Sequence, residues 1–561
     1  MLRRLVIVTV LSAVQIAFAG PKVSPDLPKS GGTNLIDVIV QFNHPPSKDD
    51  LKALGPYGQI KKHLDIINGV HIPLTPSQIL ALQNIPAIKY ITPVRPVKGA
   101  LDITTQTVNA NLAWQLGWDG TGIGVAVIDS GVANKLDLNN AAGKKSRVVY
   151  RQSWVSGTAF DDYGHGTHVA GIVGSNGLSS TGPAFSRTFK GVAPNVNLVD
   201  LRVLDANGAG SDSDAIAAIQ TAISLKSQYN IRVINLSLGR PVMESYTDDP
   251  LCQAVEAAWQ AGIVVVVAAG NYGRDNSNHT QGYATIAAPG NDPYVITVGA
   301  ANAKGTSSRS DDAIASYSSK GPTPIDHIVK PDLVAPGNNV VSLLNSTTST
   351  LDTSNARVAN KYYETGNPNG FSQDYLRLSG TSMAAPVVSG AAALLLQKNP
   401  SLTPDQVKAR LMKTAAKTLP RYMNGVDSVS LVSFYNQADI FVVGAGYLDI
   451  AAALSNTDLA TLPALSPAVK VDPVTHKIAI IRNFSVVWGD SVVWGDSVVW
   501  GDVAFAGKLL TGALAGSSVV WGDSVVWGDG TNAGYSVVWG DAVNLAIALT
   551  ASAADDGDLD Q

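Results

Sequence analysis

The sequence predicts an α/β fold with a mostly parallel, doubly wound sheet, preceded by a small α+β unit and followed by a β-prone tail that contains repeats. Three observations lead to this prediction. Between residues 105 and 456, apolar runs bounded by glycine alternate with Ala-rich stretches of helical character. Residues 35–98 show the alternation of a strand and the start of a capped helix. Residues 457–561 contain the hexapeptide SVVWGD six times.

Composition limits the class of protein. The chain has 561 residues, 45% of them hydrophobic and 15% charged, so it can bury the cores of several domains. Its single cysteine, Cys252, excludes an internal disulfide scaffold and a cysteine-based zinc cluster. We expect Cys252 to be a buried bystander in a helix. The net charge of −4 gives no electrostatic footprint for nucleic acid.

Charge divides the chain into three unlike parts. Residues 1–104 carry 11 Lys and Arg against 6 Asp, a net charge of +5. Residues 457–561 carry 4 against 12, a net charge of −8, which leaves −1 for the residues between. A basic N-terminal part, a near-neutral centre and an acidic tail are therefore expected to have different roles.

Residues 1–19 have the features of a secretory signal peptide. Arg3-Arg4 precede an apolar run from Leu5 to Phe18, and the stretch ends Ala17-Phe18-Ala19. The alternative is a membrane anchor, but the apolar run is shorter than the ~20 residues that span a bilayer. We expect a secreted protein, extracellular or associated with the cell surface, with no membrane span in its mature form.

Residues 20–104 are expected to form a linker and the small α+β unit. Apolar residues alternate from Val38 to Phe42, as in a strand. Thr75-Pro76-Ser77-Gln78 has the capping residue, proline and glutamine of a helix start, and Lys89 to Val94 favours a closing strand. Such a unit could be a binding domain or a pro-segment, and its place ahead of the motifs below favours the second.

The central part is expected to wind helices over both faces of its sheet. Short β-branched runs separated by helices are typical of βαβ units. The expected strands are Val125–Ile128, Leu198–Val203, Val233–Leu236, Ile263–Ala268 and Val295–Val298, and the expected helices include Asp214–Ile223 and Pro250–Trp259. In such sheets, sites form at the carboxyl ends of the strands.

Two motifs place titratable groups at such positions. VAVIDSG (125–131) puts Asp129 where a buried strand ends, either as a partnered carboxylate or as a turn cap. GHGTHVAG (164–171) supplies His165 and His168 at the start of a helix. Their His-x-x-His spacing lacks the glutamate of a helical zinc site, so each histidine is either catalytic or structural.

Two further motifs carry a hydroxyl and an amide. GTSMAAP (380–386) precedes a small-residue helix expected over Val387–Leu396. At the start of such a buried helix, Ser382 could be a nucleophile near unpaired N–H groups or an ordinary N-cap. AAGN (268–271) ends a strand with Asn271, which could donate to a developing oxyanion or simply occupy a turn.

Together and in this order, these motifs and INLSLG (234–239) resemble the subtilisin-like serine proteases (subtilases, peptidase family S8). The resemblance covers about residues 105–456. It implies a subtilisin-like fold and an Asp-His-Ser triad in the subtilisin-type chain order. Asp129, His165 and Ser382 would form that triad. Asn271 and the Ser382 N–H would hold the oxyanion, and His168 would be structural.

The same resemblance implies where a substrate would bind. Substrate strands would pair with Gly208-Ala209-Gly210 and Ser237-Leu238-Gly239, whose small residues allow a close backbone approach. Ala268-Ala269-Gly270 and Ala287-Ala288 would line the pocket for the residue before the cut. Because this lining is uncharged, we expect an apolar or broad preference.

The resemblance also bears on partners and cofactors. It implies a secreted serine endopeptidase (EC 3.4.21) that acts on proteins or peptides, and we expect a monomer. Residues 35–98 resemble an I9-type inhibitory propeptide with a ferredoxin-like fold, removed by autoprocessing between Pro96 and Thr107. No cofactor is required for the chemistry.

Many subtilases bind structural calcium, so the resemblance leaves room for such an ion, but the sequence assigns no ligand set. Asp205 to Asp212 fails the EF-hand template, because Ala209 stands at a ligand position and Ile216 where a glutamate belongs. Asn176 to Lys190 departs from the commonest calcium-loop spacing of the family.

The tail supports a competing hypothesis. SVVWGD combines β-prone Val-Val-Trp with turn-prone Gly-Asp. Its copies start at residues 485, 491, 497, 518, 524 and 536, and its tryptophans could pack or bind carbohydrate or a cell envelope. In this alternative, the protein binds surfaces and its protease fold is catalytically idle.

Overall fold

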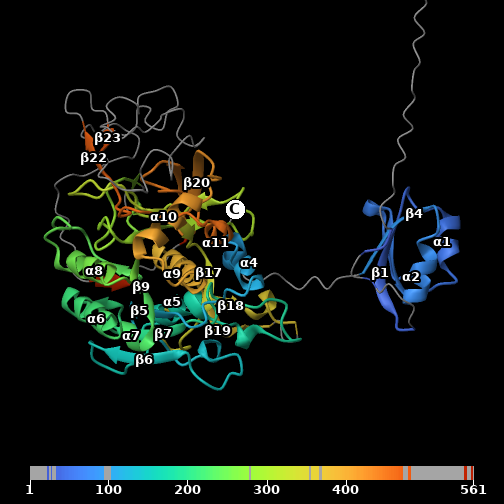
Figure 1. Ribbon diagram of the computed structural model, residues 1–561, viewed down its shortest axis with the longest axis horizontal. Helices are drawn as coiled ribbons and strands as arrows, with labels where there is room; N and C mark the ends of the chain where they lie inside the picture. The colour runs from blue at the N-terminus through green and yellow to red at the C-terminus, as the bar shows by residue number, and fades with distance from the viewer. Residues whose placement is uncertain are drawn as a thin grey trace, which may run out of the picture. The chain divides into compact units, whose positions relative to one another are not determined.

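The computed structural model describes residues 22–24, 27, 33–93, 103–276, 280–352, 356–365, 369–471, 478–481, 549–551 and 557–559. They belong to two units, Met1–Lys98 and Gly99–Gln561 (Figure 1). The expected signal peptide and all six SVVWGD copies lie outside the described residues. None of the helices in the described ranges is long and apolar enough to cross a membrane.

The N-terminal unit is an antiparallel sheet with two helices. Its elements are β1 (Ile36–Phe42), α1 (Lys48–Leu54), β2 (Lys62–Leu64), the 3₁₀ turn η1 (Asp65–Ile67), β3 (Gly69–Leu74), α2 (Pro76–Leu82) and β4 (Ile88–Pro93). The strand order is β2-β3-β1-β4, which together with the βαββαβ succession is a ferredoxin-like topology. The helix start expected at Thr75 is confirmed, since the Thr75 hydroxyl accepts from the Gln78 N–H.

The larger unit is built on an eight-stranded sheet. Its strand order is β15-β14-β11-β9-β5-β7-β6, with β16 beside β14. The strands are β5 (Gly124–Asp129), β6 (Val148–Ser153), β7 (Asn197–Arg202), β9 (Ile231–Leu236), β11 (Val264–Ala268), β14 (Ile296–Asn302), β15 (Ala313–Ile314) and β16 (Leu333–Pro336). Among these described strands, only the β14–β15 pair is antiparallel, so the expected mostly parallel α/β sheet is confirmed.

Helices cover both faces of this sheet. Figure 1 shows α6 (Asp212–Ser224) and α8 (Pro250–Gln260) on one face, and α5 (His165–Gly174) and α9 (Thr381–Lys398) on the other. Short 3₁₀ turns lie at η2 (Leu136–Leu138), η3 (Leu178–Ser180) and η4 (Asn360–Tyr362), and the remaining helices are α3 (Ile103–Thr107), α4 (Ala110–Gln115), α7 (Lys226–Tyr229), α10 (Pro404–Thr414) and α11 (Ile450–Ser455). Cys252 is buried in α8, as expected.

Smaller sheets surround this core. They contain β8 (Ala209–Gly210), β10 (Leu238–Gly239), β12 (Arg274–Asp275), β13 (Thr280–Gln281), β17 (Val340–Leu343), β18 (Arg357–Ala359), β19 (Phe371–Leu378), β20 (Tyr422–Val426), β21 (Ser433–Gln437), β22 (Ala468–Val471), β23 (Ile478–Ile481) and β24 (Leu549–Ala551). The central packing continues past residue 456, the boundary expected from the sequence, because Ala464 and Ser466 are buried against it.

A buried ionic cluster joins this later segment to the sheet. The Asp332 carboxylate lies 2.8 Å from Lys330 Nζ and 3.2 Å from Lys408 Nζ, and all three side chains are fully buried. Ser466 donates its hydroxyl to the same carboxylate at 2.5 Å. Although burial raises it, the two ammonium charges hold the pKa of Asp332 below its ordinary value.

We therefore expect Asp332→Asn to lower the free energy of unfolding by about 3–5 kcal/mol at pH 7, because two buried cations lose their counter-charge. Since the pKa of Asp332 is lower in the folded state, this stabilisation is present above about pH 4 and lost as pH falls further. Denaturant unfolding at pH 7 and pH 3 measures both. An equal effect of Asp458→Asn, whose carboxylate is exposed and paired with Lys413, would contradict the role of burial.

Candidate active site

Four expected site residues lie at one edge of the main sheet. Asp129 is the last residue of β5, and Asn271 comes three residues after the end of β11. His165 is the first residue of α5, and Ser382 is the second residue of α9. Parallel strands share one carboxyl edge, and α5 and α9 both begin at that edge, so the fold brings these residues together.

Asp129 and His165 form a buried hydrogen-bonded pair. His165 Nδ1 lies 2.8 Å from Asp129 Oδ1, and both side chains have no exposed area. The Ser130 N–H donates to the same oxygen at 2.7 Å. Helix α5 approaches β5 this closely because Gly166 has no Cβ, which would lie 2.2 Å from the Gly131 carbonyl oxygen. The carboxylate thus holds the imidazole by Nδ1 and leaves Nε2 as the ring's other functional atom.

Ser382 is tied to the residue that precedes the edge strand β10. Its Oγ donates to the Ser237 carbonyl at 3.0 Å, and Ser237 Oγ donates to the Ser382 carbonyl at 2.8 Å. In a regular helix that carbonyl would accept an N–H from residue 386, but Pro386 has none. Within the described residues, His165 Nε2 has no hydrogen-bond partner. A rotation of the Ser382 side chain is therefore needed before the two groups can bond.

Asn271 is oriented by the residue before Ser382. Its Oδ1 accepts from the N–H of Thr381 at 2.9 Å and from its hydroxyl at 3.1 Å. The Thr381 hydroxyl oxygen in turn accepts from the Gly270 N–H at 3.1 Å. Because the amide oxygen is bonded to Thr381, the amide nitrogen is the end of Asn271 directed elsewhere, as an oxyanion donor requires.

His168 lies on the same helix with a different environment. Its Nε2 is 3.1 Å from the Val340 carbonyl oxygen. Burial, with the nearby His165, lowers the pKa of His168 to about 3. A neutral imidazole bonded to a main-chain carbonyl fits a structural role.

The two expected substrate edges form short strands, and the one that follows Ser237 lies beside Ser382. They include β8 and β10, and Gly208 precedes β8 with a φ of +75°, against the ring of Tyr163. The expected pocket lining is assembled as well, because the Ala287 N–H donates to the Ala269 carbonyl at 2.9 Å. Ala268, Ala269 and Ala287 are buried.

Comparison with known proteins agrees with this geometry. The subtilase family matches residues 120–434. Serine protease AprX of Bacillus subtilis (strain 168) is 38% identical over 396 residues, which are 67% of this chain and 82% of AprX. Subtilisin DY of Bacillus licheniformis is 34% identical over 348 residues, which are 62% of this chain and 96% of that protein. The chain belongs to the subtilase family. Subtilisin E of Bacillus subtilis (strain 168) is 32% identical over 372 residues, which are 66% of this chain and 80% of that protein.

This subtilase is accordingly a serine endopeptidase with protein substrates. The resemblance to S8 proteases drawn from the motifs is confirmed. The α/β core with its mostly parallel sheet agrees with that family.

The groups beside the loop between Asn176 and Lys190 are hydrogen-bonded within the protein. In the described residues, no group of three or more His, Cys, Asp or Glu could hold a metal ion. The carboxylate of Asp137 accepts from Ser175 Oγ, Tyr375 Oη and the Ser179 N–H. The Arg147 guanidinium donates to the carbonyls of Asp137, Asn139, Gly174 and Val196. The Arg147 side chain thus binds these four carbonyl oxygens, and burial lowers the pKa of Arg147 to about 10.

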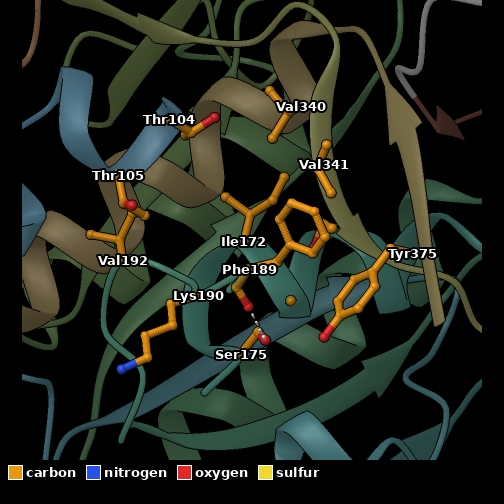
Figure 2. Close-up of a pocket in the computed structure, with 12 residues that line it drawn as sticks. Thr104, Thr105, Ile172, Ser175, Phe189, Lys190, Val192, Val340, Val341 and Tyr375 are labelled. Atoms are coloured by element: carbon orange, nitrogen blue, oxygen red, sulfur yellow. Dashed lines mark hydrogen bonds between the residues drawn. The ribbon is translucent and has the colours of Figure 1, made fainter. Parts of the chain in front are cut away.

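A small cavity lies beside this loop (Figure 2). Its volume is about 10 Å³, which is room for a single water molecule. Figure 2 shows the Ser175 hydroxyl bonded to the Phe189 carbonyl at its base, with Lys190 and Tyr375 on its walls. A cavity of this volume is too small for a peptide, and none of its twelve lining residues carries a carboxylate that would favour a calcium ion.

Sequence reasoning missed the residues that hold the site in place. Thr381 orients Asn271, and the Ser237 hydroxyl replaces a helical hydrogen bond at Ser382. The sequence contains a signal for the hydrogen bond between Ser237 and Ser382. Pro386 follows Ser382 by four residues, so the Ser382 carbonyl must find a partner outside its helix.

Proposed function

We propose that this subtilase cleaves peptide bonds with Asp129, His165 and Ser382 as its catalytic triad, and that it is made as an exported zymogen. The observation that carries the proposal is the buried 2.8 Å contact between Asp129 and His165, at the sheet edge where Ser382 stands as the second residue of α9. The supporting contacts of Ser237 and Thr381 belong to the same edge.

The first step is acylation of Ser382. Its Oγ turns from the Ser237 carbonyl to His165 and attacks the substrate carbonyl carbon, while Nε2 takes the hydroxyl proton. Asp129 stabilises the imidazolium that forms, because the charges are adjacent and shielded from water. The imidazolium then protonates the leaving amine, and the peptide bond breaks.

The negative charge on the substrate oxygen needs fixed donors. The Ser382 N–H is among the first of α9, which have no carbonyl partner within the helix and lie at its positive end. Asn271 supplies a second donor, since Thr381 engages its oxygen. The same donors act in deacylation, in which His165 activates a water molecule that releases the acyl group.

The substrate is an extended peptide. It pairs with β8 on one side and β10 on the other, which supplies main-chain affinity without demanding a particular sequence. The uncharged wall of Ala268, Ala269 and Ala287 favours apolar residues before the cut.

The N-terminal unit has the topology of an independent folded module and acts as the inhibitory propeptide in this proposal. The supporting features are its ferredoxin-like sheet, its buried core of twelve apolar residues and its place before the protease unit. The sequence features of residues 1–19 support export.

Labelling with a fluorophosphonate tests the function. We expect one covalent adduct, located on the peptide that contains Ser382, in native protein and not in denatured protein. His165→Ala should prevent labelling while leaving the fold intact. No adduct in the native protein or in the protein truncated after residue 484, or an adduct at another serine, would sink the proposal.

Asn271→Ala should lower kcat by about 10²–10³ with KM little changed, a magnitude known from the corresponding change in subtilisin itself. The oxyanion exists only after attack, so the loss belongs to the transition state. Steady-state kinetics on a chromogenic peptide measure it, with Asn291→Ala as a control for a buried asparagine that is not part of the proposed machinery. A raised KM with unchanged kcat would show that Asn271 binds the ground state instead.

A further inference from the structure

The cleft between the two substrate edges is occupied by the chain itself. Strand β24 lies between β8 and β10 and pairs antiparallel with both. Leu549 pairs with Gly210, and Thr550 pairs with Ala209 on one side and Gly239 on the other. This is the main-chain pairing through which an extended substrate would bind, supplied by a segment about 170 residues after Ser382.

The direction of β24 is that of a peptide running toward the nucleophile. From Thr550 to Ala551 its partners pass from Gly239 to Leu238, so the next residue in that direction is Ser237. Ser237 is the residue whose carbonyl accepts from Ser382 Oγ. In the same arrangement Ser382 and His165 have no exposed area. A peptide substrate can neither pair with these edges nor reach Ser382 while β24 is in place.

A second contact fixes the same segment a few residues later. The Asp558 carboxylate accepts from Arg274 Nη1 at 2.6 Å and from both the N–H and the hydroxyl of Ser316 at 2.6 Å. Arg274 also pairs with Asp427 at 2.9 Å, and the three charged side chains are at most 2% exposed. Asn338 Nδ2 donates to the Asp558 main-chain carbonyl, and its Oδ1 accepts the Asp558 N–H, each at 2.8 Å.

The neighbours of Gly557, the residue before Asp558, leave little room for a side chain. A Cβ on Gly557 would lie 2.2 Å from Ser379 Oγ and 2.8 Å from Asn338 Oδ1. A larger residue there would force Ser379 and Asn338 to shift, and Ser379 precedes Ser382 by three residues in the chain. Two main-chain hydrogen bonds hold the same residues. The Ser428 N–H donates to the Gly557 carbonyl, and the Leu559 N–H donates to the Val426 carbonyl. The protease unit therefore has a binding site for the dipeptide Gly-Asp next to its catalytic serine.

We propose that residues 549–551 and 557–559 are a built-in inhibitory ligand of the active site, held by the Gly-Asp site around Arg274 and Ser316. The proposal rests on the proposed function, because it takes β8 and β10 as the substrate edges. Charge supports it, since Arg274 lies between two carboxylates and contributes the cation that a buried Asp558 requires. A substrate would then reach Ser382 only after the Asp558 carboxylate leaves Arg274 and Ser316.

Two substitutions test the Asp558 contact and the β24 pairing separately. Asp558→Asn removes the charge that Arg274 and Ser316 hold, and Thr550→Pro removes a main-chain donor in the middle of β24. Intact mass should first confirm that the wild-type and variant secreted proteins are processed equally and keep their C-terminal segment. Each variant should then speed fluorophosphonate labelling of Ser382 by at least about tenfold. Asp458→Asn, which removes an exposed carboxylate elsewhere, should leave the rate unchanged.

A synthetic peptide of residues 546–561 provides the second measurement. Added to protein truncated after residue 484, which also removes the six Gly-Asp pairs of the repeats, it should inhibit peptide hydrolysis competitively. The same peptide with the Asp558→Asn change should bind at least about tenfold more weakly.

Different results would overturn the inference and the proposed function. Equal labelling rates in wild type, both variants and the truncated protein would refute the inference alone. Rapid cleavage of the peptide with loss of inhibition would also refute it, because the segment would then be a substrate. No labelling of Ser382 in any form, the truncated protein included, would refute the proposed function itself.

Discussion

Ser382→Ala is expected to lower kcat for peptide hydrolysis by about 10⁶, the size known for the same change in subtilisin itself. The variant loses the atom placed to attack the substrate carbonyl carbon. Asn271 and the first N–H groups of α9 remain, so a rate of about 10³–10⁴ above the uncatalysed reaction should persist. KM should change little, because the Ser382 hydroxyl makes no main-chain substrate contact.

The fold should tolerate this change. Ser382 Oγ donates a hydrogen bond to the Ser237 carbonyl, whereas the reciprocal bond from Ser237 Oγ uses the Ser382 main chain and survives. Denaturant unfolding should therefore give a free energy within about 1.5 kcal/mol of wild type. Ser389→Ala, which removes a buried hydroxyl further along α9, is the matched control and should keep full activity.

The same variant tests self-processing. If the protease unit releases its own N-terminal unit, the Ser382→Ala protein should keep residues 35–98 attached, as intact mass will show. Processing at the normal position in this variant would mean that another protease makes the cut. The assignment of Ser382 as the nucleophile would then rest only on the loss of kcat in this variant.

Much of the fold could be predicted because its strands are locally marked. A fully buried parallel strand such as β11 is a continuous apolar run, which few other structures produce. Strand β6 was missed because it lies at the sheet edge. Its residues are half-buried and mix apolar with polar side chains, so no run or alternation appears. The helix expected at Val387 begins six residues earlier, at Thr381, because the Ser237 hydroxyl satisfies the Ser382 carbonyl that Pro386 leaves without an N–H partner.

The site was predictable where its chemistry lies in short motifs and not where it depends on tertiary contact. Asp129, His165 and Ser382 each stand in a recognisable heptapeptide or octapeptide. The bond between Ser237 and Ser382 joins residues 145 positions apart, and that between Arg274 and Asp558 joins residues 284 apart. No local pattern marks Gly557-Asp558 as a ligand, because the groups that bind it, Arg274, Ser316 and Asn338, come from separate segments of the chain.

Asp129→Asn is expected to lower kcat by up to about 10⁴, or about 5.5 kcal/mol of transition-state stabilisation, the size known for the same change in a chymotrypsin-type protease, where the wrong imidazole tautomer forms. The structure indicates which part of the carboxylate's role is lost. Oδ1 accepts from both the Ser130 N–H and His165. An asparagine can keep both bonds only with its oxygen in that place, because its NH₂ group would otherwise face the Ser130 donor. The imidazole should therefore retain its tautomer and lose mainly the negative charge opposite the developing imidazolium.

A second substitution separates the charge from the geometry. Asp129→Ala removes both, so it should be slower than Asp129→Asn, and KM should be similar in the two because neither side chain touches a substrate strand on β8 or β10. Active-site titration corrects for unfolded protein. Asp137→Asn, a buried aspartate bonded to Ser175 and Tyr375, serves as the control and should keep wild-type kcat per titrated site. Equal rates for the two Asp129 variants would mean that holding His165 in place adds nothing beyond the charge. A wild-type rate in Asp129→Asn would mean the reverse, that Asp129 supplies orientation and its charge is dispensable.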